Sequence, residues 1–249
     1  MFDLSGKVAL VTGAGQGVGA GIARQLARAG AAVAVNDLHE ARAAQTVAAV
    51  HGAGGTATVA AFDVTDFDAV RAGVAAVERE LGPIGVLVND AGIPPSMRPV
   101  PFRAMDVGEW APYVDVNLYG VLHCVKAVID GMCERGFGRI VTISSGAGTV
   151  GLNIGVSLYA AGKGGGISFM RHLAMETARS GVTANTLALG LMERPGADRT
   201  VTGSMERQIP VGRLGTGDDV GYACVYLASD EASWITGQTI ELNGGAVTS

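Results

Sequence analysis

Short apolar runs alternate along the chain with longer segments that carry apolar residues at helical spacing. The first run covers residues 8–11, and residues 18–29 then repeat apolar side chains every three or four positions, as one face of an α-helix does. Residues 32–35 form the next apolar run. A strand, a turn, a helix and a second strand in this order predict a βαβ unit.

The same alternation continues to the end of the chain. Thr65 is the expected N-cap of the next helix, and Pro112 is expected to interrupt a later helix near its start. Apolar strands between helices suit a parallel sheet that is buried on both faces. We therefore expect an α/β fold, with one doubly wound Rossmann-type domain of about seven strands over residues 1–249. The further strands are predicted at 58–62, 86–89, 140–144, 183–187 and 238–242, and the further helices at 66–81, 106–133, 157–180 and 218–228.

One segment, residues 190–214, is too irregular for either pattern. It contains two prolines and several glycines among polar residues. A connection of this length in a compact domain is usually functional. We expect it to form a loop or lid over the substrate.

Composition and charge restrict the possible partners. Hydrophobic residues make up 48% of the chain, the formal net charge is -5, and no run of Lys or Arg occurs, so nucleic acid and anionic membranes are not expected partners. The three cysteines are scattered and predict neither a disulfide framework nor a metal site. No apolar stretch is long enough to span a bilayer, and the first residues lack the pattern of a signal peptide. We expect a cytoplasmic protein that acts on a small molecule.

A glycine-rich turn joins the first strand to the first helix. Gly13, Gly17 and Gly19 would let the backbone approach a pyrophosphate closely, and the N–H groups of Gln16 to Gly19 would meet an anion at the helix start. Val18 lies within the same turn. A tight turn without a ligand could have this composition, but its position between strand and helix favours a dinucleotide site.

Asp37 ends the second predicted strand. An acidic side chain at this position accepts hydrogen bonds from the ribose hydroxyls of the adenosine. The 2′-phosphate of NADP would meet a like charge there. Neither Gln16 nor Leu38 supplies a cation for that phosphate, and His39 is only partly charged at neutral pH. Asp37 therefore favours NAD as the cofactor.

Tyr159 and Lys163 lie one turn apart on the same face of a predicted helix. A tyrosine with a pKa near ~10 is a poor base at neutral pH, and a nearby ammonium favours its phenolate form. The pair could therefore perform general acid–base chemistry. The spacing is common by chance, so the pair alone does not decide the function.

Several motifs together give the chain a resemblance to the short-chain dehydrogenase/reductase family over essentially its whole length. They occur in the order that is typical of the family. The motifs are Thr12-Gly13-x-x-x-Gly17-x-Gly19, Asp63-Val64, Asn89-Asp90-Ala91-Gly92, Asn117, Ser144-Ser145, Tyr159-x-x-x-Lys163 and Leu189-Gly190.

The resemblance implies a role for each catalytic residue. Tyr159 would be the general acid/base, and Lys163 would hold the nicotinamide ribose and lower the tyrosine pKa. Ser145 would bind the substrate oxygen, and Asn117 would hold a water that links Lys163 to solvent. The nicotinamide would supply the hydride.

The resemblance also implies that later strand ends contribute to the nucleotide site. Asp63 and Val64 would face the adenine. The other contacts would come from residues after the fourth and sixth strands, which are Asn89, Ala91, Gly92, Gly190 and Met192.

The chain departs from the family pattern at several places, one of which is around Glu193-Arg194, where the family often has Thr. Asp90 stands where the family usually has Asn, and Leu189 stands where it usually has Pro. Ser145 lies 14 positions before Tyr159, one more than the commonest spacing, so Ser144 is a reserve candidate for the catalytic serine.

Four glycines follow or flank Lys163 within the predicted helix, at a cost of up to ~1 kcal/mol each relative to Ala. In the family this helix packs against its copy in a neighbouring subunit, and glycines would permit close approach. We therefore expect a homotetramer, with a weak or kinked helix as the alternative. The four residues are Gly162, Gly164, Gly165 and Gly166.

The resulting prediction is an NAD(H)-dependent oxidoreductase that interconverts a secondary alcohol and a ketone. One alternative is an NADPH-dependent 3-oxoacyl thioester reductase, against which Asp37 counts. A second alternative is a dinucleotide-binding protein that has lost catalysis, against which the complete set of catalytic motifs counts.

Overall fold

In the computed structural model, the chain forms one seven-stranded sheet in the order β3-β2-β1-β4-β5-β6-β7. The structure describes residues 2–93, 97–193, 203–204 and 206–248. All neighbouring strands are parallel, which confirms the predicted doubly wound sheet. The strands are β1 (Val8–Thr12), β2 (Ala32–Asp37), β3 (Thr56–Ala61), β4 (Ile84–Asn89), β5 (Gly138–Ser145), β6 (Val182–Leu189) and β7 (Thr239–Leu242).

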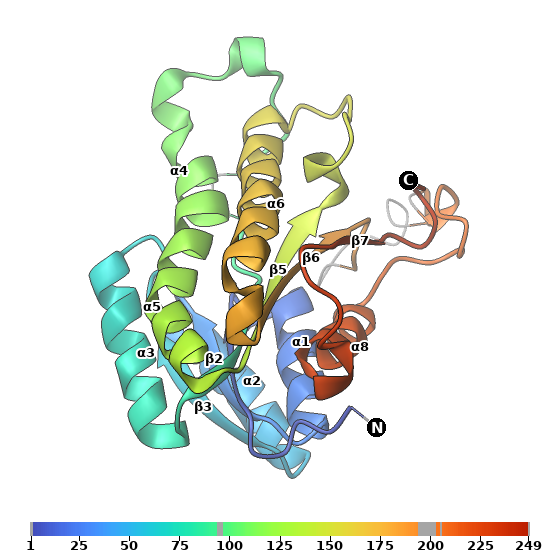
Figure 1. Cartoon of the computed structure of the whole chain (residues 1–249). Helices are drawn as coiled ribbons and strands as arrows, with labels where there is room; N and C mark the ends of the chain where they lie inside the picture. Colours follow the sequence, from blue (N-terminus) through green and yellow to red (C-terminus); the bar gives the residue numbers. More distant parts are fainter. Residues whose placement is uncertain (1, 94–96, 194–202, 205, 249) are drawn as a thin grey trace.

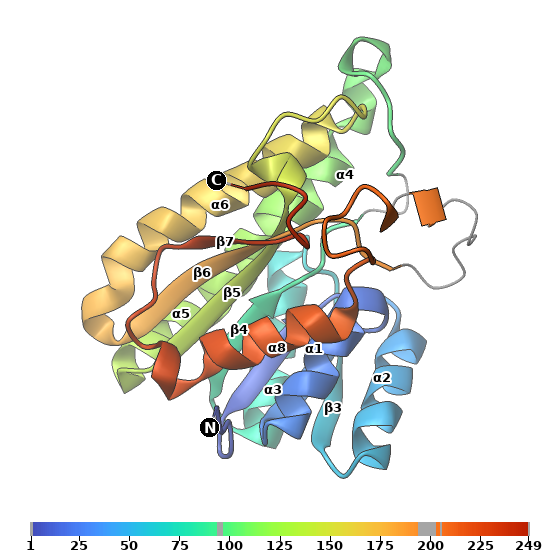
Figure 2. The same ribbon diagram turned by 90° about the vertical axis from the view of Figure 1, so that its right-hand side faces the viewer.

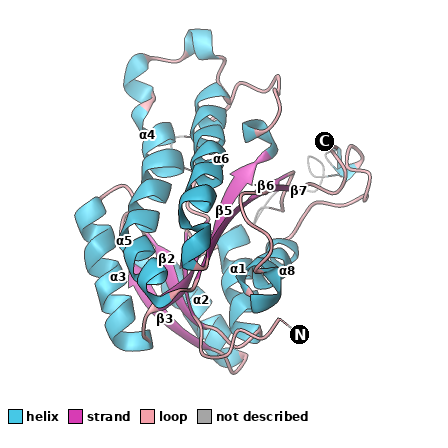
Figure 3. Ribbon diagram, viewed as in Figure 1, coloured by secondary structure: helices cyan, strands magenta, loops and turns pink. Residues whose placement is uncertain are grey.

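Two layers of helices enclose the sheet, as Figures 1 and 2 show from two sides, and Figure 3 shows the strands between them. One layer contains α1 (Gly17–Arg28), α2 (Glu40–Gly52) and α8 (Gly217–Ala228). The other layer contains α3 (Phe67–Leu81), α5 (Gly120–Arg135) and α6 (Ser157–Thr177).

The central strands β1 and β4 are almost entirely apolar because the sheet is buried on both faces there. In β1, Ala9 and Val11 pack toward the layer of α1, α2 and α8, whereas Val8 and Leu10 pack toward the opposite layer. Full burial of a Val or Leu side chain contributes about 1.5–3 kcal/mol. Continuous apolar runs are therefore stabilising here, where an alternating pattern would leave polar side chains in one of the two cores.

The structure adds α2, which the sequence pattern did not reveal. Its buried positions are Ala43, Thr46, Val47 and Val50, which follow helical spacing. Several other positions of the helix are alanine, so the contrast between its two faces is weak.

Two local predictions about helices were wrong. The N-cap of α3 is Asp66 rather than Thr65, because the Asp66 carboxylate accepts hydrogen bonds from the N–H groups of Asp68 and Ala69. Pro112 does not interrupt a helix, because it lies in the first turn of α4 (Ala111–Val114), where a helix needs no N–H donor.

A π-helical turn, Asp115–Tyr119, joins α4 to α5. The helical segment is therefore continuous from α4 to the end of α5, and its irregular turn contains Asn117. Such π-bulges frequently occur at functional sites.

The described part of the chain contains no helix that could cross a membrane, and no group of three metal-ligating side chains was found within it. Cys124 and Cys224 are buried free thiols, and Cys133 is a partly buried one.

Candidate active site

The predicted site residues gather at the carboxyl edge of the sheet. Because all strands run in one direction, β1, β2, β4 and β5 end along the same edge. From β1, the sheet extends through β2 to β3 on one side and through β4, β5 and β6 to β7 on the other side. Ligands of doubly wound folds bind in the crevice at such a switch point.

The glycine-rich turn is shaped by close backbone contacts. Gly13 has a φ of +65°, and a Cβ on it would lie 2.8 Å from the Ala91 Cα. Gly17 has a φ of +54°, and no neighbouring atom lies within 4 Å of its Cβ position. The N-cap of α1, Gln16, makes no side-chain capping bond. The turn therefore leaves open space at an uncapped helix start, which fits a pyrophosphate.

The Asp37 carboxylate lies against the same turn. Its Oδ2 accepts a hydrogen bond from the Gly15 N–H at 3.2 Å, and its Oδ1 accepts one from the His39 N–H at 2.9 Å. Asp37 is buried. These two bonds fix the carboxylate at the end of β2, beside the start of α1.

Arg42 is a cation near this position that the sequence reasoning missed. A Cβ on Gly15 would lie 2.5 Å from Asp37 Oδ2 and 2.6 Å from the Arg42 Cβ. Arg42 lies in the first turn of α2 and is exposed. Since α2 itself was not predicted, no signal in the sequence placed Arg42 beside Asp37.

Lys163, Asn117 and Gly92 meet in the buried part of the site. A Cβ on Gly92 would lie 2.8 Å from Asn117 Oδ1 and would collide with Lys163 Nζ. The Lys163 ammonium donates a hydrogen bond of 2.7 Å to the Ile143 carbonyl, and it lies 5.8 Å from the centre of the Tyr159 ring. Burial lowers the pKa of Lys163 to about 8, although the charge of Asp90 opposes this shift.

Asn117 has one polar atom without a protein partner. Its amide nitrogen donates to the Tyr113 carbonyl at 2.9 Å, but no described residue bonds its buried Oδ1. A buried acceptor in this state ordinarily binds ordered water. The π-helical turn places this oxygen beside Lys163 and Gly92.

The two candidate serines differ in their surroundings. Ser144 is buried, and its hydroxyl donates to the Lys163 carbonyl at 3.3 Å. Ser145 is only partly buried, and its hydroxyl accepts the Ala147 N–H at 3.2 Å. Only the Ser145 hydroxyl retains a proton donor for a ligand, since the Ser144 proton is committed to the helix.

Comparison with known proteins agrees with this architecture. The family model described as "Enoyl-(Acyl carrier protein) reductase" matches residues 13–247. The acetoacetyl-CoA reductase of Shinella zoogloeoides is 40% identical over 243 residues, which is 96% of this chain and 98% of that protein. The chain belongs to the short-chain dehydrogenase/reductase family. It is therefore an oxidoreductase of that family.

Two solved structures of this short-chain dehydrogenase/reductase fold carry nucleotides. A gluconate 5-dehydrogenase from Burkholderia cenocepacia, in complex with NADP and tartrate, has a TM-score of 0.90 and 35% identity, covering 98% of this chain and 96% of that one. A 3-oxoacyl-[acyl-carrier protein] reductase from Brucella melitensis with bound NAD has a TM-score of 0.91 and 33% identity, covering 100% of this chain and 94% of that one.

The remaining residues that the family resemblance suggested lie around the crevice. The Asp63 carboxylate accepts two hydrogen bonds of 2.8 Å from Thr65, and Val64 is buried against Gly120. Asn89 is buried at the end of β4 and donates to the Thr142 hydroxyl at 3.2 Å.

Hydrogen bonds fix the first residues of the segment that follows β6. The Gly190 N–H donates to the Leu242 carbonyl at 3.1 Å, and Met192 forms a bridge with Gly215. Within the predicted loop at 190–214, residues 194–202 and 205 lie outside the described residues.

Thr12 is a further residue that the sequence reasoning did not assign to the site. Its hydroxyl accepts the N–H groups of Asp90 at 3.1 Å and Ala91 at 3.2 Å. It therefore joins the end of β1 to the turn after β4. A polar residue that ends an otherwise apolar buried strand was the available signal.

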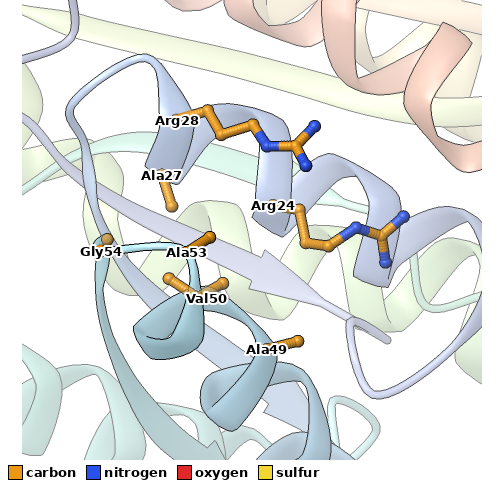
Figure 4. Close-up of a pocket in the computed structure, with 8 residues that line it drawn as sticks. Arg24, Ala27, Arg28, Ala49, Val50, Ala53 and Gly54 are labelled. Carbon is orange, nitrogen blue, oxygen red and sulfur yellow. The ribbon is translucent and has the colours of Figure 1, made fainter.

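A separate hollow of 220 Å³ lies between the later turns of α1 and α2 (Figure 4). Arg24 and Arg28 border it, and the Arg24 guanidinium is paired with Asp218 at 2.9 Å. Its lining includes the connection from α2 to β3, which enters the sheet at the opposite edge. This hollow is therefore not part of the crevice.

Proposed function

We propose that this enzyme interconverts a secondary alcohol and a ketone with NAD(H), and that Tyr159 is its general acid/base. The observation that carries the proposal is the meeting of Lys163 Nζ, the Tyr159 ring and Asn117 Oδ1 beside Gly92, at the edge where the glycine-rich turn opens. This arrangement joins a proton donor to a nucleotide site.

The bound nicotinamide supplies or accepts the hydride. In the direction of reduction, the Tyr159 hydroxyl gives its proton to the carbonyl oxygen as negative charge develops there. The Lys163 ammonium stabilises the resulting phenolate by its charge and holds the ribose of the nicotinamide. Ser145 donates a second hydrogen bond to the same carbonyl oxygen, which fixes its orientation.

Asn117 completes the proton path in this proposal. Its buried Oδ1 lies within reach of the space beside Lys163 and would bind a water there. That water would return a proton to Tyr159 by way of Lys163. The residues proposed to touch the nucleotide are those at the strand ends: Gly13, Gln16, Gly17, Val18, Gly19, Asp37, Asp63, Val64, Asn89, Ala91, Gly92, Gly190 and Met192.

The preference for NAD(H) rests on Asp37. Its buried carboxylate is fixed by two backbone N–H groups and would repel a 2′-phosphate while accepting hydrogen bonds from ribose hydroxyls. Arg42 favours the alternative, because its Cβ lies beside the same turn and a guanidinium binds phosphate well. Asp37 is nearer to the ribose position in the family pattern, so we infer that it dominates.

Steady-state rates with NADH and NADPH test this preference. The wild type is expected to have a kcat/KM for NADH at least about tenfold above that for NADPH, and Asp37→Ser should remove most of the difference, about 1.4 kcal/mol. Arg42→Ala is the matched control, because it removes the opposite charge and should make the preference for NADH stronger. A wild type that prefers NADPH would overturn the assignment.

A 3-oxoacyl thioester is the first substrate to test. The relatives include an acetoacetyl-CoA reductase and a 3-oxoacyl-[acyl-carrier protein] reductase, and the segments beside the crevice expose the apolar side chains of Ile93, Leu152 and Leu191. Such side chains suit an acyl chain better than a sugar acid. Faster turnover of gluconate-like polyols than of acetoacetyl-CoA would favour the dehydrogenase branch instead.

The homotetramer stays a prediction. The glycines of α6, from which it was inferred, support it less strongly in the folded chain. The glycines of α6 contact this same chain: a Cβ on Gly162 would lie 2.8 Å from the Asn117 Cβ, and one on Gly165 would lie 3.3 Å from Leu118. Packing within the subunit therefore accounts for Gly162 and in part for Gly165, whereas a Cβ on Gly164 or Gly166 would meet atoms only at 3.4 Å or more. The cytoplasmic location also stays a prediction.

A further inference from the structure

Asp90 is a partly buried acid that the proposed mechanism does not use. It follows β4, where the family usually has Asn. A Cβ on Gly19 would lie 2.6 Å from Asp90 Oδ2, and the Asp90 carboxylate accepts the N–H of Gly19. Gly19 lies in the first turn of α1, so the carboxylate holds the helix whose start forms the glycine-rich turn.

The groups around Asp90 come from four elements. Lys163 of α6 and the buried Cys224 thiol of α8 lie close enough to interact with its charge, and the Gly19 N–H of α1 donates to it. Gly92, two residues after Asp90, lies directly against Lys163 Nζ. The Thr12 hydroxyl of β1 fixes the Asp90 backbone. Lys163 is the one cation among these neighbours, and the thiol is neutral because burial and the Asp90 charge both raise the pKa of Cys224.

We propose that Asp90 is a positioning residue that anchors the first turn of α1 and supplies the negative charge that supports the Lys163 ammonium. It thereby joins the nucleotide-binding turn to the catalytic lysine. The inference rests on the proposed function, because it takes Lys163 as the catalytic lysine.

The electrostatics agree with this geometry. Burial alone lowers the pKa of Lys163, and the charge of Asp90 raises it, with a result of about 8. Conversely, burial raises the pKa of Asp90 to about 7, while Lys163 and the Gly19 N–H oppose that rise. Each group therefore supports the charged form of the other in a region that disfavours both charges.

The substitution Asp90→Asn tests the effect of the negative charge apart from the hydrogen bond to α1. The amide retains an oxygen that can accept the Gly19 N–H, but it carries no charge. Without that charge, Lys163 loses its proton at lower pH. At alkaline pH, kcat/KM falls and the NADH dissociation constant rises. In Asp90→Asn, both changes should occur at a pH about one unit lower than in the wild type. Asp130→Asn is the control, because Asp130 is an exposed acid paired with Lys126 on α5, and its profiles should match the wild type.

Asp90→Ala tests the anchor. It removes the acceptor as well as the charge, so the NADH dissociation constant at neutral pH should rise about tenfold above that of Asp90→Asn. Circular dichroism establishes that the variant folds. If it does not fold, the pH profiles of Asp90→Asn remain the deciding measurement.

NADH fluorescence requires no substrate, so these binding profiles separate this inference from the proposed function. If no carbonyl compound is reduced but the binding limb of Asp90→Asn moves, the proposed reaction is wrong and the link between Asp90 and Lys163 stands. If the profiles of Asp90→Asn coincide at alkaline pH with those of the wild type and Asp130→Asn, that result overturns the claim that the Asp90 charge supports the Lys163 ammonium. An Asp90→Ala protein that binds NADH as tightly as Asp90→Asn overturns the anchor.

Discussion

Ser144 and Ser145 are neighbours in sequence, yet the fold gives them different partners. The Ser144 hydroxyl is spent on the Lys163 carbonyl, whereas the Ser145 hydroxyl only accepts a backbone N–H. The sequence spacing to Tyr159 left both candidates open. The hydrogen-bond partner and the burial of each side chain distinguish them, and both depend, at the last residues of a strand, on the segments that pack beside it.

This difference predicts opposite effects of two conservative substitutions. Ser145→Ala should lower kcat for ketone reduction by about 10²-fold or more, because it removes a donor to the developing oxyanion. Ser144→Ala should leave kcat close to the wild type and lower the free energy of unfolding by about 1 kcal/mol. Steady-state kinetics and urea unfolding measure the two effects, and the reverse pattern would identify Ser144 as the catalytic serine.

Asp90 also predicts a pH dependence of stability in the nucleotide-free protein. Burial raises its pKa from 3.8 to about 7, so the folded chain keeps a proton over a range in which the unfolded chain has lost it. The stability from this group is complete below about pH 4 and is lost as the pH rises to about 7. Lys163 has the opposite effect, because its pKa is lowered from 10.5 to about 8. Stability therefore rises with pH between about pH 8 and pH 10.5, which lies outside this window.

Urea unfolding at about pH 5 and about pH 7 measures this effect. Between these values, the free energy of unfolding of the wild type should decrease by about 2 kcal/mol more than that of Asp90→Asn. Asp130→Asn should follow the wild type, since its carboxylate is exposed. Equal pH dependence in the wild type and Asp90→Asn would contradict the raised pKa.

At the scale of elements, α6 shows which properties of a helix can be predicted from the sequence and which cannot. Its start and its Tyr159–Lys163 face were predicted correctly, because helical periodicity and side-chain spacing are local properties. The predicted end at 180 includes the 3-10 turn Ala178–Ser180 that follows α6. The role of its glycines in a subunit contact stays a prediction, and within the chain the π-helical turn around Asn117 closely approaches Gly162 and Gly165. No local pattern reveals which element a glycine faces.

Gly162→Ala tests that close approach. The added methyl group would lie 2.8 Å from the Asn117 Cβ and 3.1 Å from the Tyr113 carbonyl oxygen, so we expect a loss of about 1–3 kcal/mol in stability and a lower kcat as Asn117 is displaced. Gly52→Ala is the matched control at the end of α2, where no atom lies within 4 Å of the Cβ position. It should gain about 0.5 kcal/mol from helix propensity. Thermal or urea unfolding compares the two variants, and equal stabilities would contradict the packing.

At the scale of the whole molecule, the sheet was the most predictable feature. Apolar runs marked the strands, of which β1 and β4 are buried along their whole length, and the intervening helices required parallel strands. The exact order of the strands, and the presence of Arg42 beside Asp37, depended on contacts between distant segments. The sequence prediction of the cofactor therefore considered only the charge of Asp37, whereas the folded site also contains the charge of Arg42.

The fold places the glycine-rich turn, Asp37, Lys163 and Tyr159 along one edge of the sheet, although they are far apart in sequence. In the proposed mechanism, this arrangement brings the nucleotide-binding turn and the proton donor together. The central claim is that Tyr159 transfers the proton that accompanies hydride transfer.

Tyr159→Phe tests that claim most directly, by the rate of NADH oxidation with acetoacetyl-CoA and a panel of other ketones, alongside NADH binding by fluorescence. We predict a fall in kcat of about 10²- to 10⁴-fold, with an NADH dissociation constant within about threefold of the wild type, because the nucleotide contacts remain. A Tyr159→Phe enzyme that reduces its best ketone at the wild-type rate would contradict the account.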